Sequence, residues 1–255
     1  ANPQLSIYKH VVCKLTKKFE LKLIDINFDF RKDSICGDPD TDSRMLYDAQ
    51  KLLWNKRLPN GELFDLNVIG NSSRLLLKSD LIGNLSSDRI CPHFYGKYNG
   101  KFNDWMSEKE GEEFKYVVRT IGGHIVFPAH RKDGFTINQA RGVNRKISDR
   151  FDLTLECVRR FYDDEQSPLY STLMRYSNFL NLFANFRGFV DFFLLQDFLD
   201  KNGKIIFCIP FDNFKRDPLP ESQFEYENYK NKTIELIKKR NLRILKETKP
   251  AHNNV

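Results

Sequence analysis

The sequence is poor in cysteine, and its cysteines include no CxxC pair. Five cysteines are scattered among 255 residues, and their number is odd. A small disulfide-bonded scaffold needs many closely spaced cysteines, so that class of protein is excluded. We therefore expect reduced thiols in the core of a cytoplasmic protein. These residues are Cys13, Cys36, Cys91, Cys157 and Cys208.

Long hydrophobic runs are also missing. The longest apolar stretch, FVDFFLLQDFL at residues 189–199, contains three polar residues and is shorter than the roughly 20 residues that cross a membrane. The first residues lack a positive start followed by an uninterrupted apolar segment, so we expect no signal peptide and no membrane partner. Because 40% of the residues are hydrophobic, the chain has enough apolar side chains to form a core.

Motifs that hold nucleotides or metal ions are absent as well. Neither GxxxxGK[ST] nor GxGxxG occurs, which excludes a standard phosphate loop and a standard dinucleotide-binding turn. HExxH and HxH are missing, and Cys91 and His93 stand alone without further ligands nearby. We therefore expect neither a metal ion nor a cofactor.

Positive charge is distributed unevenly along the chain. There are 41 Lys and Arg against 34 Asp and Glu, which gives a net charge of +7. Residues 9–25 and 230–249 together carry +9, so the remainder has a charge of −2. Basic ends of this kind are typical of contact with a phosphate backbone, but also of solvated lysine-rich helices. The sequence leaves both interpretations open.

The pattern of apolar residues and turns predicts a helix-rich α+β domain with a small mixed or antiparallel sheet. We expect an N-terminal extension at 1–26, a single globular domain at 27–247 and a C-terminal tail at 248–255. Helices are predicted near 46–53, 104–120, 138–146, 151–162, from 168 onward and at 221–247. Short strands are predicted at 63–69, 74–79, close to 89, at 124–129 and at 204–211.

A dense group of cations lies between His130 and Arg150, where six Lys and Arg face two acidic residues. Burying such charge is costly unless an anionic ligand or internal carboxylates neutralise it. Two interpretations follow: the arginines bind a phosphate or carboxylate ligand, or they form a structural network with neighbouring acids. The candidate ligand-binding residues are Arg131, Asn138, Gln139, Arg141 and Arg150.

Two histidines frame the short strand predicted beside this group. His124 follows two glycines and opens the strand, a position suited to proton transfer next to a ligand. His130 follows its end, and Glu156 on a later helix would orient or share the proton. The catalytic candidates are therefore His124, His130 and Glu156. The alternative is that His124 is a hydrogen-bonded core residue and that Glu156 neutralises Arg159.

Several blocks of the sequence resemble an uncharacterised bacterial family, a domain of unknown function. The resemblance spans roughly residues 27–245 and implies a single-domain bacterial protein without a catalytic assignment. A composition rich in Lys, Asn, Ile and Phe suggests an AT-rich gene of the kind found in mobile or phage-defence islands. The blocks are FDFRKD at 28–33, DPDTDSRMLYDAQKLLWNKRLPNGELFDL at 38–66, TIGGHIVFP at 120–128, INQARGVNRKISDRFDLTLECVRRFY at 137–162, FRGFVDFFLLQDF at 186–198 and PFDNF at 210–214.

These patterns favour a cytoplasmic bacterial protein that binds a phosphate-bearing ligand, RNA or a nucleotide, in a pocket lined by arginine and histidine. A metal-independent, toxin-like ribonuclease fits them, with a histidine moving the proton and Arg131, Arg141 and Arg150 stabilising phosphorane charge. One alternative is a non-enzymatic interaction or regulatory protein, with a protein partner, whose arginines form a salt-bridge network. A second alternative is an ADP-ribosyl transfer enzyme.

Overall fold

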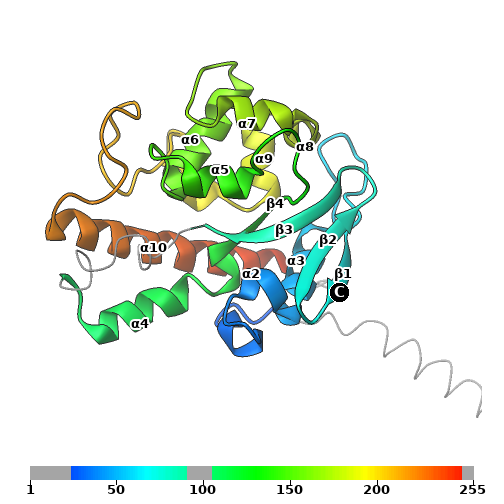
Figure 1. Cartoon of the computed structure of the whole chain (residues 1–255), viewed down its shortest axis with the longest axis horizontal. Helices are drawn as coiled ribbons and strands as arrows, with labels where there is room; N and C mark the ends of the chain where they lie inside the picture. Colours follow the sequence, from blue (N-terminus) through cyan, green and yellow to red (C-terminus); the bar gives the residue numbers. More distant parts are fainter. Residues whose placement is uncertain (1–23, 91–104, 249–255) are drawn as a thin grey trace, which may run out of the picture.

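The computed structural model describes residues 24–90 and 105–248 (Figure 1). Within these residues an antiparallel sheet of four strands is combined with a larger number of helices, which confirms the predicted α+β class. Of the predicted N-terminal extension only 24–26 is described, and Ile24 and Ile26 are buried in the core. None of the described helices is long and apolar enough to cross a membrane.

The sheet has the order β1-β2-β3-β4, and each strand is antiparallel to its neighbours. Gly70 and Gly83 adopt positive φ angles where the first hairpins turn, a conformation that glycine reaches without steric cost. Arg89 at the end of β3 pairs with His124 at the start of β4, so both lie at one end of the sheet. The strands are β1 (Asn67–Asn71), β2 (Arg74–Ser79), β3 (Gly83–Arg89) and β4 (His124–Pro128).

Short helical elements from the first part of the chain pack against β2 and β3. Pro39 occupies the first turn of α2, where its fixed φ suits a helix start and its missing N–H costs nothing. The Ser43 hydroxyl accepts a hydrogen bond from Leu46 N and caps α3, as serine commonly does at this position. These elements are η1 (Phe30–Asp33), α2 (Pro39–Asp42) and α3 (Arg44–Trp54).

The remaining helices form two groups. Figure 1 shows α5 to α9 together at the top of the view, above β4, while α10 and α4 lie below it. α10 packs against α4 and against the short helix that precedes β4. The elements are α4 (Glu108–Val117), η3 (Ile121–Gly123), α5 (Ile137–Val143), α6 (Phe151–Tyr162), α7 (Tyr170–Arg175), α8 (Ser177–Leu180), η4 (Asn181–Phe183), α9 (Phe186–Phe192), η5 (Gln196–Phe198) and α10 (Gln223–Thr248).

Aromatic side chains from α8, η4 and α9 make up a large part of the core. Phe183 is central, with ring centroids 4.9 Å from Phe192 and 5.0 Å from Phe193. Phe179 and Phe189 complete the group at 5.3 and 5.4 Å from Phe183. The separations are those of favourable edge and tilted contacts between rings, so the helical spacing of these residues reflects packing.

Two local predictions are wrong. Residues 204–211 form no strand, and only an isolated bridge joins Ile205 to Leu199. The Asp152 carboxylate accepts the N–H of Cys208 at 2.9 Å, so a side chain replaces the sheet partner that the pattern suggested. Cys36 is exposed instead of lying in the core, whereas Cys157 is buried. Cys13 and Cys91 lie outside the described residues.

Candidate functional site

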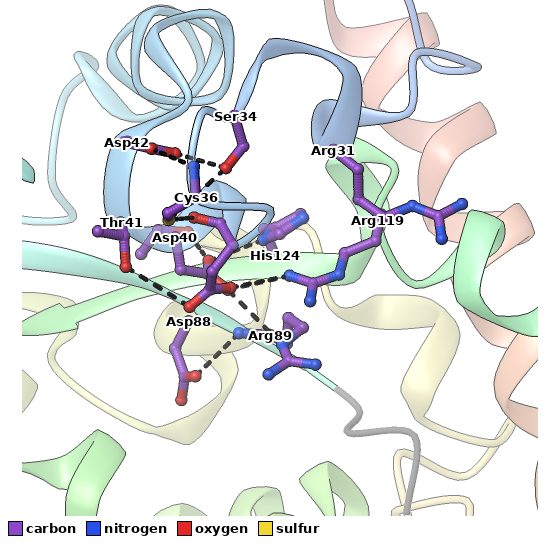
Figure 2. A network of polar contacts seen from close by, with 12 residues as sticks. Arg31, Ser34, Cys36, Asp40, Thr41, Asp42, Asp88, Arg89, Arg119 and His124 are labelled. Carbon is purple, nitrogen blue, oxygen red and sulfur yellow. Dashed lines mark hydrogen bonds and ion pairs between the residues drawn. The ribbon is translucent and has the colours of Figure 1, made fainter. Parts of the chain in front are cut away.

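Charged side chains meet where the start of α2 faces the adjoining ends of β3 and β4 (Figure 2). Figure 2 shows Arg89, Arg119 and His124 converging on Asp40 from different directions. Arg119 comes from the turn after α4, and Asp38 from the residue preceding α2. We call these five residues, Asp38, Asp40, Arg89, Arg119 and His124, the central polar cluster.

Asp40 is the anchor of the central polar cluster. Its Oδ1 accepts hydrogen bonds from His124 Nδ1 at 3.0 Å and from the Ser87 hydroxyl at 2.5 Å. Burial alone would raise the pKa of Asp40, but His124, Ser87 and Arg89 lower it to about 2. Asp40 is therefore ionised across the neutral range and acts only as an acceptor.

A second layer of hydrogen bonds fixes the position of Asp40. The Tyr47 hydroxyl donates to the Asp40 carbonyl at 2.8 Å and accepts the N–H of Ser87 at 3.3 Å. Gln50 donates to the Ser87 hydroxyl at 2.9 Å. Tyr47 and Gln50 both lie on the buried face of α3, so that helix aligns α2 with β3 and leaves Asp40 little freedom.

The two arginines of the central polar cluster face one oxygen of Asp40. Arg89 Nε lies 3.7 Å and Arg119 Nη1 lies 3.8 Å from Asp40 Oδ2. Both distances exceed that of a hydrogen bond. Burial, and then the proximity of Arg89, lowers the pKa of Arg119. Two cations are thus held close together by one carboxylate that neither contacts at short range.

Asp38 provides the short ion pair of Arg119, at 3.1 Å from Asp38 Oδ1 to Nη1. Asp38 occupies the position before α2, yet its side chain does not cap the helix and remains available to Arg119. The Asp38 side chain is 47% exposed, whereas that of Arg119 is 8% exposed. The carboxylate therefore has solvent on one side, but its departure would leave the buried Arg119 without its shortest partner unless another anion replaced it.

His124 is fully buried, and its ring makes a T-shaped contact with Phe30 at 6.0 Å between centroids. Because Asp40 is ionised, Nδ1 must carry the proton of their hydrogen bond. Among the described residues the other nitrogen, Nε2, is buried without a hydrogen-bond partner. His124 lies where the sequence predicted a functional histidine, although its observed contact is with a carboxylate inside the protein.

Arg141 belongs to α5 and forms an ion pair with Asp88, the residue before Arg89 on β3. Its guanidinium also donates to Thr154 Oγ1 at 3.0 Å and to the Asp149 carbonyl at 3.1 Å, and the side chain is fully buried. Burial, followed by the charges of Asp40 and Asp149, raises the pKa of Asp88 to about 7 against the opposing effect of Arg141. Arg141 is thus occupied by protein groups.

Arg150 and Glu156 are also held by neighbouring protein groups. Arg150 is buried, pairs with Asp152 and donates to the Pro218 carbonyl at 2.9 Å. Glu156 accepts hydrogen bonds from Arg159 at 2.9 Å and Arg160 at 2.7 Å. These contacts lie on α6 and its flanks.

The other predicted residues lie around β4 and α5. The carbonyl of His130 accepts a hydrogen bond from the Tyr176 hydroxyl at 2.7 Å, and Arg131 is exposed. Asn138 donates to the Ser86 hydroxyl at 3.1 Å. Gln139 forms the capping box that starts α5. Of the eight predicted site residues, only His124 belongs to the central polar cluster, and Arg141 reaches its edge through Asp88.

Sequence reasoning missed four members of the central polar cluster. The run DPDTDS at 38–43 supplies Asp38 and Asp40, the partners of Arg119 and His124, and neither was among the predicted site residues. Arg119 directly precedes the block TIGGHIVFP, and Arg89 ends a predicted strand. The position of these charged residues next to apolar blocks was the available sign of a functional site. No sequence spacing indicated that they would lie close together.

Among residues 24–90 and 105–248, no three His, Cys, Asp or Glu side chains are grouped as a metal ion requires. The fold and the cluster define a helix-rich α+β domain with a charged site at one end of an antiparallel sheet. The chain belongs to a protein family described as a family of unknown function (DUF6994), which matches residues 24–244 and all of the central polar cluster. This confirms the resemblance to a domain of unknown function. Searches of curated proteins and of solved structures found no match.

Proposed function

We propose that this protein binds a phosphate-bearing ligand and that Arg89 and Arg119 contact the phosphate. The observation that carries the proposal is the approach of both guanidinium groups to Asp40 Oδ2 at 3.7 and 3.8 Å. Guanidinium groups bind phosphate oxygens through paired N–H donors. Among the described residues, neither guanidinium makes a short contact with Asp40 Oδ2, and we propose that a phosphate binds the donors beside it.

Ligand binding in this proposal displaces the Asp38 carboxylate from Arg119. Asp38 and Asp40 balance the two arginines, so an added anion competes with one of them. Asp40 is held by His124 and Ser87, whereas Asp38 is about half exposed and can turn into solvent. The phosphate would then take the position opposite Arg119 that Asp38 occupies in the free protein.

The ion pairs of α10 favour a small ligand, such as a nucleotide, over a long RNA strand. RNA affinity depends on several cations that neutralise successive phosphates. Several described cations of α10 are instead paired with acidic side chains, which weakens the electrostatic field that an RNA backbone would meet. These pairs are Lys230 with Glu110, Lys238 with Glu113, Lys239 with Glu235 and Arg243 with Asp197.

The contact between His124 and Asp40 supports a second proposal, in which the protein cleaves RNA without a metal ion. A carboxylate that holds Nδ1–H fixes the imidazole tautomer and leaves Nε2 to take up a proton. Because Nε2 is buried, the substrate would have to displace the side chains that cover it. Cleavage of a short RNA by the wild-type protein, but not by His124→Gln, would support this proposal. Equal cleavage by both would overturn it.

Calorimetric titration with AMP, ATP and a short single-stranded RNA tests the binding proposal. Arg89→Ala should weaken nucleotide binding at least about tenfold, equivalent to about 1.4 kcal/mol. Arg187→Ala is the matched control, because Arg187 is an exposed arginine whose ion pair with Asp191 lies on α9. Binding of all ligands by Arg89→Ala with wild-type affinity would overturn the proposal. Stronger binding of RNA than of nucleotides would assign the site to RNA.

A further inference from the structure

We propose that α10 positions the phosphate site through Arg240 and Asn241, which hold the short segment between Arg119 and His124. This inference rests on the proposed function. Neither α10 residue contacts the phosphate in it. Each acts through the backbone that carries the cluster residues, so both are positioning residues.

Asn241 forms two hydrogen bonds with this segment. Its Oδ1 accepts the N–H of Gly122 at 2.7 Å, and its Nδ2 donates to Thr120 Oγ1 at 2.8 Å. Asn241 is buried, and so are both of its partners. A buried amide that uses both ends of its side chain fixes distance and orientation together. Asn241 thereby determines where the chain leaves Arg119 and where it enters η3.

Arg240 holds the other end of the same segment. Its Nη1 donates to the carbonyls of Gly122 at 2.9 Å and His124 at 2.8 Å, and its Nη2 donates to the Phe193 carbonyl at 2.9 Å. Burial lowers the pKa of Arg240 to about 9, so the guanidinium stays charged at neutral pH. The planar guanidinium of Arg240 therefore fixes the position of the backbone at His124.

Gly122 allows α10 to approach this closely. A Cβ atom at Gly122 would lie 2.5 Å from Asn241 Oδ1 and 2.8 Å from the Ile237 carbonyl. Neither distance is compatible with ordinary van der Waals contact. The glycine therefore belongs to the positioning device, because any side chain here would push the segment away from α10.

The segment at 120–123 links Arg89, Arg119 and His124. Arg119 precedes it and His124 follows it in the chain. The carbonyl of Gly123 accepts the N–H of Ile90 at 2.8 Å, and Ile90 directly follows Arg89. A shift of this short segment would therefore move Arg89, Arg119 and His124 relative to Asp40.

A double-mutant cycle on the full chain tests the inference, with inorganic phosphate as the probe. The variants are Asn241→Ala, Arg119→Ala and their combination, and each is measured for phosphate affinity and thermal unfolding. Lys230→Met is the control: it removes the ion pair between the buried Lys230 of the same helix and the half-exposed Glu110. Lys230 lies eleven residues, or about 16 Å, along α10 from Asn241. The imidazole NMR signals of His124 provide a second readout that needs no ligand.

Asn241→Ala should weaken phosphate binding about tenfold in the wild-type background and by a clearly smaller factor when Arg119 is already alanine, because Arg89 is then the one phosphate-binding arginine left to be displaced. A general loss of stability would not produce this coupling. Lys230→Met should lower the unfolding temperature without changing phosphate affinity. Equal weakening by Asn241→Ala in both backgrounds, or no weakening, would overturn the inference.

Two further outcomes are distinguishable. If the wild-type protein fails to bind phosphate, nucleotides and RNA, the proposed function fails, and positioning is judged by His124 alone. The imidazole signals of His124 should then shift in Asn241→Ala and remain unchanged in Lys230→Met. Unchanged signals in both variants would overturn the positioning role of Asn241 as well. If Asn241→Ala does not fold, Thr120→Val takes its place in the double-mutant cycle. Thr120→Val removes one of the two hydrogen bonds of Asn241, and the same results would support or overturn the inference.

Discussion

His124 and Asp40 lie 84 positions apart in the sequence, and a hydrogen bond of 3.0 Å joins Nδ1 of one to Oδ1 of the other. This bond connects β4 with α2 at the end of the sheet where Arg89 is also located. Asp40 therefore has two roles in the protein. It stabilises the fold as an ionised carboxylate, and it holds the cations of the central polar cluster together.

The first prediction concerns the stability of the protein in acid. The pKa of Asp40 is about 2, below its ordinary value of 3.8, so its ionisation stabilises the folded state above about pH 4. That stabilisation should be lost as the pH falls from about 4 towards 2. Asp40→Asn should lower the free energy of unfolding at pH 6 by about 2 kcal/mol, the equivalent of the shift. Denaturant unfolding from pH 2 to 7 measures the difference.

The difference between wild type and Asp40→Asn should shrink as the pH approaches 2. Asp48→Asn is the control, since Asp48 forms an exposed ion pair with Arg44 of a kind that contributes about 0–1 kcal/mol. The difference in the free energy of unfolding between the wild type and Asp40→Asn could instead stay constant over this pH range. That result would show that the charge of Asp40 does not stabilise the fold.

A second prediction follows from competition between Asp38 and the ligand for Arg119. Asp38→Asn removes the anion that occupies Arg119 in the free protein. We therefore expect this variant to bind AMP about threefold to tenfold more tightly than the wild type, a gain of about 1 kcal/mol. Calorimetry at low and high salt measures the effect. Weaker binding by Asp38→Asn would mean that the carboxylate contacts the ligand directly.

A third prediction separates structural from ligand-binding arginines. Arg141→Met leaves Asp88 without its buried cationic partner, and breaking a buried ion pair costs about 3–5 kcal/mol. Asp88→Asn in the same chain should restore part of this loss by removing the uncompensated carboxyl. Arg44→Ala, at an exposed ion pair, should cost under about 1 kcal/mol. A cost for Arg141→Met as small as that control would refute the structural assignment.

The fourth prediction concerns the close approach of α10 to the segment before β4. Gly122→Ala should destabilise the protein by about 1–3 kcal/mol, the usual cost of inserting a methyl group into a packed interior. Gly142→Ala is the control for a milder contact, because its Cβ would lie 3.2 Å from the carboxylate of the Asp149 side chain, which has to shift by only a few tenths of an ångström, and alanine favours the α5 helix. Thermal unfolding of both variants gives the comparison. Equal stability of Gly122→Ala and the wild type would show that α10 is not tightly packed there.

Most of the fold could be predicted from local patterns. The strand predicted at 74–79 is β2 (Arg74–Ser79), and the last predicted helix corresponds to α10 (Gln223–Thr248). Alternating and helical spacings of apolar residues indicate which face of a strand or helix is buried. They can be recognised from residues that are close together in the sequence. The strand predicted at 204–211 is not formed: the N–H of Ile206 still donates to the Phe198 carbonyl, but that of Cys208 donates to the Asp152 side chain instead of to another strand.

The central polar cluster could not be predicted in the same way. Arg119 and Asp38 are 81 positions apart, and Arg141 and Asp88 are 53 apart. Only the packing of α2, β3 and β4 brings such residues together. The density of cations at residues 130–150 did indicate buried charge. It did not show that Arg141 and Arg150 have internal carboxylate partners, whereas Arg89 and Arg119 are the pair beside Asp40.

If Arg89 and Arg119 form a phosphate site, their side-chain NMR signals should respond to phosphate. The Nε–H resonances, assigned with Arg89→Lys and Arg119→Lys, are followed while inorganic phosphate and then AMP are added to the full chain. We predict saturable shifts of both resonances, with the resonance of the buried and paired Arg150 unchanged. Shifts confined to exposed arginines such as Arg187, or no saturable shift at Arg89 and Arg119, would contradict the proposed phosphate site.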